Sequence, residues 1–188
     1  TVSKELGIEL YVKRDDLTSW GAGGNKLRKL EYLVADALAQ GATMLVTEGG
    51  AQTNHGRLTA AVAAKYGLKC AIVMIDEYPG EVSANILLDR IMGCDLILKA
   101  DDGTDEHDQF AALCAQVIAE YEAKGEKVYY IPMGGSTALG ALGYYDCAME
   151  LTAQAEEMGL GDARVIDAVG SMGTYMGLYC GLKNEGSP

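Results

Sequence analysis

Runs of residues typical of β-strands and of α-helices alternate along almost the whole chain, and this alternation limits the fold more than any other feature. Strand patterns occur at residues 10–14, 43–47, 69–75, 94–98, 128–131 and 165–169. Helical periodicity occurs between them, at residues 26–40, 53–66, 81–92, 104–124, 139–158 and 174–183. Strands that alternate with helices predict about six β–α units in an α/β fold, with a parallel sheet and right-handed crossovers.

Several strand patterns are continuous apolar runs, such as AIVMI at 71–75 and RVIDAV at 164–169. Such runs suit strands that helices cover on both faces, which predicts an open, three-layer architecture. In open parallel sheets, ligands bind beyond the carboxyl ends of the strands. We therefore expect the chemistry of this protein to lie in the loops that follow strands.

Composition narrows the classes of partner. The formal net charge is −12, from 15 Lys and Arg against 27 Asp and Glu, so nucleic acid and anionic membranes are disfavoured. No apolar run approaches the roughly 20 residues of a membrane span. The five cysteines form no CxxC pair, so neither a disulfide framework nor a metal site is expected, and a cytoplasmic location is the natural inference.

The loop before the helix at 26–40 carries an unusual concentration of positive charge. Gly23 and Gly24 are followed by Asn25, Lys26, Leu27, Arg28 and Lys29. Lys26 and Lys29 are three residues apart and share a face of the helix. Cations oppose the dipole at a helix N-terminus, so a simple solvated turn explains them less well than a site for an anion.

Three more glycine-rich loops follow strand patterns. They are Glu48–His55, which contains Thr53 and Asn54, then Met133–Gly140, and finally Gly170–Thr174. Each is compatible with an ordinary turn or helix cap, but together they place hydroxyl and backbone N–H groups at one edge of the sheet. The last loop has neither the GK[ST] ending of a P-loop nor GxGxxG spacing. A phosphate cradle beside a lysine in a glycine-rich loop favours pyridoxal phosphate as the cofactor.

Four segments resemble the family of D-cysteine desulfhydrases and 1-aminocyclopropane-1-carboxylate (ACC) deaminases. The matching segments are YVKRDDLTSWGAGGNKLRKLEYLVADALAQGA, TEGGAQTNHGRLTAAVAAKYGLKC, IPMGGSTALGALGYYDCAMEL and GSMGTYMGLYCGLK. These enzymes depend on pyridoxal phosphate and have fold type II, like the tryptophan synthase β subunit. The resemblance covers nearly the whole chain and implies the same α/β fold.

The resemblance also implies residue roles. Lys26 matches the lysine that holds the cofactor covalently and acts as the catalytic base, and Asn25 is its neighbour. Lys29 matches a lysine that contacts the phosphate, and the phosphate loop matches Gly170, Ser171, Met172, Gly173 and Thr174. Asn54 matches the asparagine that hydrogen-bonds the 3′ oxygen of the cofactor. Thr53, Asn54 and His55 match the loop that receives the substrate carboxylate.

Two loops separate the branches of this family. Thr53-Asn54-His55 and Gly134–Ser136 resemble the desulfhydrase branch more than the deaminase branch, which typically has Ser-Asn-Gln and Gly-Cys-Ser there. The resemblance therefore implies a lyase that converts D-cysteine to pyruvate, ammonia and hydrogen sulfide. ACC deaminase and cysteate sulfo-lyase are the alternatives, with a small amino acid as substrate in each case. Thr53 replaces a serine, and Met172 replaces a small residue, which bears on substrate size.

Members of this family run well past residue 188, so the chain is expected to be an incomplete copy. The implied layout is a small α/β domain at residues 29–138, inserted between two parts of a larger cofactor domain at 1–28 and 139–188. A homodimer is implied by the resemblance alone. If the chain were the whole natural product, a cofactor-binding module without turnover, or a structural fragment without a ligand, would be the alternatives.

Overall fold

The computed structural model describes residues 2–76 and 82–184 and contains one parallel sheet of four strands. The strands are β1 (Met44–Glu48), β2 (Lys69–Ile75), β3 (Asp95–Lys99) and β4 (Val128–Ile131). Their order across the sheet is β3-β2-β1-β4. Met44 lies opposite Lys69 of β2 and opposite Val128 of β4, so β1 is central and hydrogen-bonded on both sides.

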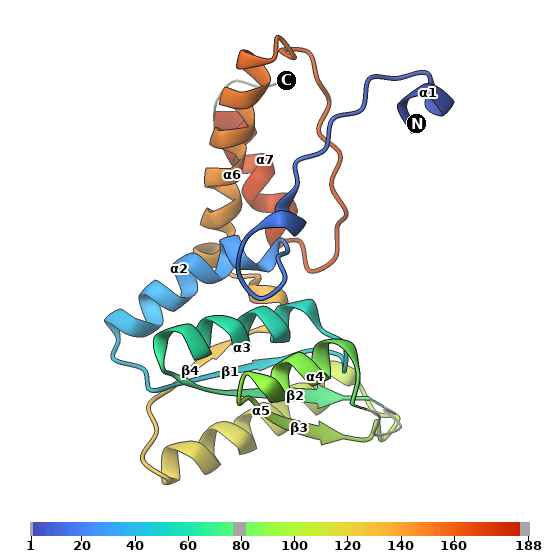
Figure 1. Ribbon diagram of the computed structural model, residues 1–188. Coiled ribbons are helices and arrows are strands. Elements are labelled where there is room, and N and C mark those ends of the chain that lie inside the picture. The colour runs from blue at the N-terminus through green and yellow to red at the C-terminus, as the bar shows by residue number, and fades with distance from the viewer. Residues whose placement is uncertain (1, 77–81, 185–188) are drawn as a thin grey trace.

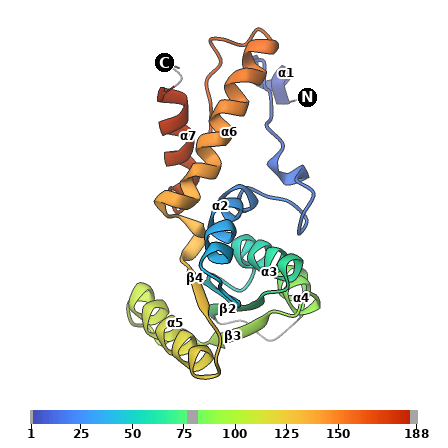
Figure 2. The ribbon, with the colours of Figure 1, turned by 90° about the vertical axis from the view of Figure 1, so that its left-hand side faces the viewer.

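Helices cover both faces of this sheet, as the sequence predicts (Figures 1 and 2). α2 (Lys26–Ala39), α3 (Asn54–Tyr66) and α4 (Ala84–Ile91) lie on one face, and α5 (Glu106–Ala123) lies on the other. Successive strand residues point to opposite faces. Leu45 packs with the first group of helices, and Met44 and Val46 pack with α5. The expected three-layer α/β class is confirmed.

Two further helices extend from the sheet. α6 (Ala138–Glu157) packs against α2 and against α7 (Gly173–Asn184), which runs beside it (Figures 1 and 2). The close approach of α7 to α6 depends on glycine, because a Cβ at Gly177 of α7 would lie 2.3 Å from the Ala141 carbonyl oxygen of α6. A Cβ at Gly143 would lie 2.0 Å from the Arg28 carbonyl oxygen. Small residues therefore set how α6 sits on both α2 and α7.

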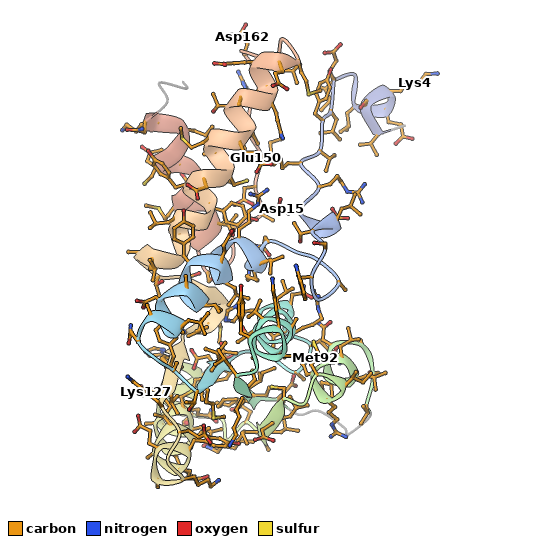
Figure 3. The ribbon with its side chains drawn as sticks, turned by 60° about the vertical axis from the view of Figure 1, so that its left-hand side comes forward. Lys4, Asp15, Met92, Lys127, Glu150 and Asp162 are labelled. Atoms are coloured by element: carbon orange, nitrogen blue, oxygen red, sulfur yellow. The ribbon has the colours of Figure 1, made fainter. Side chains whose placement is uncertain are left out.

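Ion pairs join the N-terminal segment to α2 and α2 to α6. The N-terminal segment includes α1 (Val2–Leu6) and a short 3₁₀ turn, Asp15–Leu17. Asp15 and Glu150 lie close together in Figure 3, and Arg28 of α2 forms ion pairs with both, each at 2.9 Å. The Tyr144 hydroxyl of α6 also donates to Asp15, at 2.5 Å. These contacts fix the start of α2, where the predicted site lies.

Two of the six predicted strands are wrong. Residues 10–14 and 165–169 are in neither helix nor strand, and Ile166 is 87% exposed. A strand needs a neighbour for its backbone N–H and C=O groups, and within the described residues neither segment has one. The predicted helix at 81–92 begins at Ala84; residue 81 lies outside the described part of the chain. No helix of the described residues is both long and apolar enough to cross a membrane.

Candidate functional site

The N-terminus of α2 and the loop before α7 come together in one pocket, although they are far apart in sequence. The Asn25 side chain donates a hydrogen bond to the Thr174 hydroxyl, 149 residues away, at 3.0 Å. The residues that line the pocket are Asn25, Lys26, Lys29, Ala168, Val169, Gly170, Ser171, Met172, Thr174 and Tyr175. The structure thus gathers the predicted lysines and the predicted phosphate loop.

Lys29 is the most buried charged group of this pocket, with 1% of its surface exposed. Its Nζ donates to the Gly134 carbonyl oxygen at 3.1 Å and lies 3.3 Å from the Ser136 Oγ. Burial, together with the charge of Lys26, lowers the pKa of Lys29 to about 8, and the charge of Asp167 acts against this shift. An ammonium group that is desolvated but not fully paired is prepared to bind an anion.

Lys26 lies one turn earlier, also lines the pocket and is half-buried. Its Nζ is 3.5 Å from the Asn25 Oδ1. Burial lowers the pKa of Lys26, and the nearby Asp167 acts against that shift. A lower pKa increases the share of neutral amine, which is the nucleophilic and proton-accepting form. Sequence reasoning did not single out Asp167, because it lies inside an apolar strand pattern.

Gly173, in the loop at 170–174, lies directly against Lys29. The hydroxyls of Ser171 and Ser136 are hydrogen-bonded at 2.6 Å. A Cβ at Gly173 would lie 2.7 Å from the Ser136 Oγ and 2.8 Å from the Lys29 Nζ, so only glycine leaves this space open. Gly173 also begins α7, whose first N–H groups have no partner within the helix. Met172 is 51% exposed, with a left-handed φ of 63°.

The loop at 53–55 begins α3 and lies outside the lining of this pocket. The Thr53 side chain caps the helix by accepting a hydrogen bond from the Gly56 N–H at 3.2 Å. Asn54 is exposed at the first position of the helix. The first turn therefore offers the backbone N–H groups of residues 54 and 55 to an anion.

His55 is almost fully buried beneath the glycine loop at 133–135 rather than open to solvent. Its Nε2 lies 2.9 Å from the Thr47 Oγ1, and Thr47 donates its own proton to the Ile131 carbonyl oxygen. His55 is therefore the donor to Thr47, which leaves Nδ1 as an acceptor. Burial, with the charges of Lys26 and Lys29, lowers the pKa of His55 to about 3. The ring is neutral at physiological pH.

Two positioning residues were missed by sequence reasoning. Arg57 of α3 donates through Nη2 to the Gly23 carbonyl oxygen at 3.1 Å, which ties α3 to the loop before Lys26. Glu48, at the end of β1, accepts from the Met133 N–H at 3.3 Å and supports the loop that binds Lys29. Both side chains are buried. The sequence alone does not mark them, because their burial is set only in the folded chain.

A parallel α/β scaffold that presents two lysines and a glycine–hydroxyl loop to one pocket defines a protein built to hold an anionic ligand. The chain belongs to the family of pyridoxal-phosphate dependent enzymes, which matches residues 1–188. The fold is that of the fold-type II members, as the resemblance implied. We therefore describe the pocket as a candidate pyridoxal phosphate site.

Comparison with known proteins found close relatives of the chain. It is 45% identical over 194 residues to the D-cysteine desulfhydrases of Salmonella paratyphi B and Salmonella newport, which covers 97% of this chain and 56% of each relative. A crystal structure of an ACC deaminase homologue superposes with a TM-score of 0.84 at 37% identity, covering 99% of this chain and 55% of that one. A hydrogen sulfide-producing enzyme from Fusobacterium nucleatum, with a TM-score of 0.65 at 21% identity over 88% of this chain and 52% of that one, shows the fold alone. The chain spans about half the length of the curated relatives it matches.

Proposed function

We propose that this protein is a pyridoxal 5′-phosphate-dependent lyase that removes the β substituent of a small amino acid. D-cysteine is the proposed substrate, with pyruvate, ammonia and hydrogen sulfide as products. The observation that carries this proposal is the convergence of Lys26 and Lys29 with the loop at 170–174 in one pocket. The 45% identity to D-cysteine desulfhydrases supports the choice of substrate.

The residues of the pocket fit the phosphate of this cofactor. Lys29 supplies a buried positive charge, and Ser171 and Thr174 supply hydroxyl groups. The N-terminus of α7 adds backbone N–H groups and the positive end of its dipole. Gly173 keeps the space beside the Lys29 Nζ free, where a Cβ would intrude. Charge, donors and space therefore agree with a phosphate site.

The cofactor supplies an electron sink that stabilises negative charge on the substrate α carbon. Lys26 would hold the cofactor covalently, and its released amine would take the α proton at Nζ. Its lowered pKa favours this, because more of the amine is neutral near neutral pH. Asn25, 3.5 Å from this Nζ and anchored to Thr174, limits where the amine can move.

The substrate carboxylate is assigned to the N-terminus of α3. The Thr53 side chain is occupied as the helix cap, and the His55 ring faces Thr47. These two residues would therefore contribute through the backbone of the first turn, while the Asn54 side chain remains exposed for direct contact. This arrangement stabilises a carboxylate through N–H groups and the helix dipole.

The test begins with cofactor attachment in the intact protein. Borohydride reduction in the presence of pyridoxal 5′-phosphate, followed by peptide mass spectrometry, is expected to place a pyridoxyl group on Lys26. Lys26→Ala is the control and should carry none. A pyridoxyl group on another lysine alone, or on none, would contradict the assignment.

Product analysis then distinguishes the substrates. D-cysteine should give sulfide and pyruvate, ACC would give 2-oxobutyrate, and cysteate would release sulfite. ACC deamination is the second candidate, because the ACC deaminase homologue superposes closely. Attachment to Lys26 without turnover of any of the three would favour a binding module.

The remaining assignments follow the resemblance. We propose a small domain at residues 29–138 between two parts of a cofactor domain, at 1–28 and 139–188. The sheet lies wholly inside the first range, and α7 and all of α6 except its first residue, Ala138, lie inside the last. A cytoplasmic homodimer is also proposed. Size-exclusion chromatography with light scattering would test the dimer.

A further inference from the structure

One edge of the sheet, formed by β3, is open among the described residues. β3 is the outermost strand on its side and pairs there only with β2. Ile75 lies opposite Lys99, and the Asp76 N–H donates to the Lys99 carbonyl oxygen at 3.1 Å, so the backbone of Lys99 faces β2. Backbone groups of successive strand residues point to alternate sides, so those of Leu96 and Leu98 face outward. An open edge of this kind presents N–H and C=O groups to another strand.

Apolar side chains are exposed beside this edge. Leu98 of β3 is 44% exposed. α4 packs against α3 and β3, so it lies over the same part of the sheet (Figure 1). Leu87, Leu88 and Ile91 share an exposed face of α4, because they are three and four residues apart. An open strand with exposed apolar neighbours is typical of a surface that another chain covers.

The sequence of β3, DLILK, is complementary to a second copy of itself in antiparallel orientation. Leu96 and Leu98 carry the outward groups, so each must oppose Leu96 or Leu98 of the second copy. With Leu96 opposite Leu98, a twofold axis passes through Ile97, and Asp95 lies directly opposite Lys99 at both ends of the pair. With Leu96 opposite Leu96, or Leu98 opposite Leu98, neither charge has an opposite charge across from it. Charge therefore selects a single register.

Both charged side chains have capacity for this contact. The Tyr121 hydroxyl donates to the Asp95 Oδ2 at 2.5 Å, and within the described residues no hydrogen bond reaches Oδ1. The Lys99 ammonium pairs with Asp102 at 2.8 Å and has two further N–H groups, with 43% of its side chain exposed. An exposed ion pair contributes little energy, so its role is to fix the register. The backbone hydrogen bonds of Leu96 and Leu98 and their apolar contact would stabilise the pair.

We propose that two copies of this chain associate through their β3 edges, antiparallel about Ile97, to form one sheet that continues across both copies. Leu96 and Leu98 exchange backbone hydrogen bonds with the second copy, and Asp95 and Lys99 set the register. The inference rests on the proposed homodimer and deepens it, by naming the surface at which the copies meet. It does not depend on the assignment of the cofactor or of the substrate.

The test measures the mass of the intact protein by analytical ultracentrifugation over a range of concentrations. The wild type is expected to form a dimer. Lys99→Glu places like charges opposite each other at both ends of the pair, so dimerisation should weaken by about 10- to 100-fold. Asp95→Lys should have the same effect for the same reason. Lys4→Glu is the matched control, because it makes the same change of charge on an exposed residue of α1, and it should leave the mass unchanged.

A mixture of the two variants separates recognition from folding. When one Asp95→Lys chain meets one Lys99→Glu chain, opposite charges again face each other at both ends of β3. The mixture is therefore expected to recover the dimer that neither variant forms alone. A mixture of folded variants that stays monomeric would overturn the inference. Loss of folded structure in either variant, checked by circular dichroism, would assign these side chains to the fold of one chain and would overturn it as well.

The same measurements distinguish this interface from the proposals on which it builds. A wild type that is monomeric at every concentration would refute the proposed homodimer, and this interface with it. A dimer that both variants retain would refute the β3 interface alone. Neither result bears on the cofactor, whose attachment to Lys26 is tested separately by borohydride reduction.

Discussion

Gly173→Ala tests the geometry of the phosphate site with the smallest possible change. The added Cβ would lie 2.8 Å from the Lys29 Nζ and 2.7 Å from the Ser136 Oγ, whereas ordinary contacts begin at 3.4 Å. The ammonium and the hydroxyl must each move by about 0.6–0.7 Å, the difference between these distances. The φ of residue 173 suits alanine, which is favourable at the start of a helix, but the Ser136 Cα at 3.1 Å must also yield by a few tenths of an ångström.

The expected effect is on cofactor affinity rather than on stability. A hydrogen bond to a charged group contributes about 1.5–3 kcal/mol, and 1.4 kcal/mol is a factor of ten in affinity. Displacing Lys29 from the phosphate should therefore weaken pyridoxal 5′-phosphate binding by about 10- to 100-fold. The assay is an absorbance titration of the apo form of the intact protein, with a thermal melt beside it.

Gly170→Ala is the matched control within the same loop. A Cβ there has nothing within 4 Å, and its φ is not in the left-handed region, so affinity should change by less than about twofold. If the two variants bind the cofactor equally well, Lys29 and Gly173 do not form the phosphate site. If Gly173→Ala loses its folded structure, the close contact serves packing instead.

Three further outcomes are expected. The pKa of His55 is about 3 in the fold and 6.5 in the unfolded chain, so protonation favours the unfolded chain. Lowering the pH from 7 to 5 should therefore reduce the free energy of unfolding of the wild type by about 2 kcal/mol relative to His55→Gln, as measured by urea unfolding. Lys29→Met should raise the stability of the apo form by up to about 3 kcal/mol at pH 7, since a pKa of about 8 means that folding disfavours the charged lysine; its cofactor affinity should fall about 100-fold. Met172→Gly should raise the melting temperature by a few degrees, because it relieves a left-handed backbone at a cost of about 1 kcal/mol to methionine.

The predictable part of the fold is the part whose elements find partners within the chain. The run AIVMI at 71–75 is predicted as a buried strand, and β2 is indeed paired on both sides by β1 and β3. The run at 165–169 has the same apolar character, but no described strand lies beside it. Periodicity and hydrophobicity describe what a segment can bury, whereas a strand also requires a hydrogen-bonding neighbour.

The candidate site divides in a similar way. Lys26 and Lys29 were predictable, because cations among glycines at a helix start are unusual and lie close together in sequence. Arg57 and Glu48 were not predictable, because their contacts with the Gly23 carbonyl oxygen and the Met133 N–H form only in the folded chain. The burial of His55 also depends on a contact with Thr47 across the sheet face. Sequence spacing therefore predicts site residues that lie within one helical turn of each other, whereas site residues from separate elements are identified only by tertiary contacts.

The energetics of Lys29 connect the stability of the apo form to cofactor binding. Its ammonium is buried against Gly134 and Ser136, two partners that carry no opposite charge, so the folded apo form carries a desolvation cost. A bound phosphate would supply the missing negative charge and offset that cost. Because a ligand that binds only the folded state stabilises it, the cofactor would hold α2, the loop at 133–135 and α7 together. The buried charge of Lys29 therefore destabilises the empty site, and it is also the group through which the cofactor would stabilise the fold.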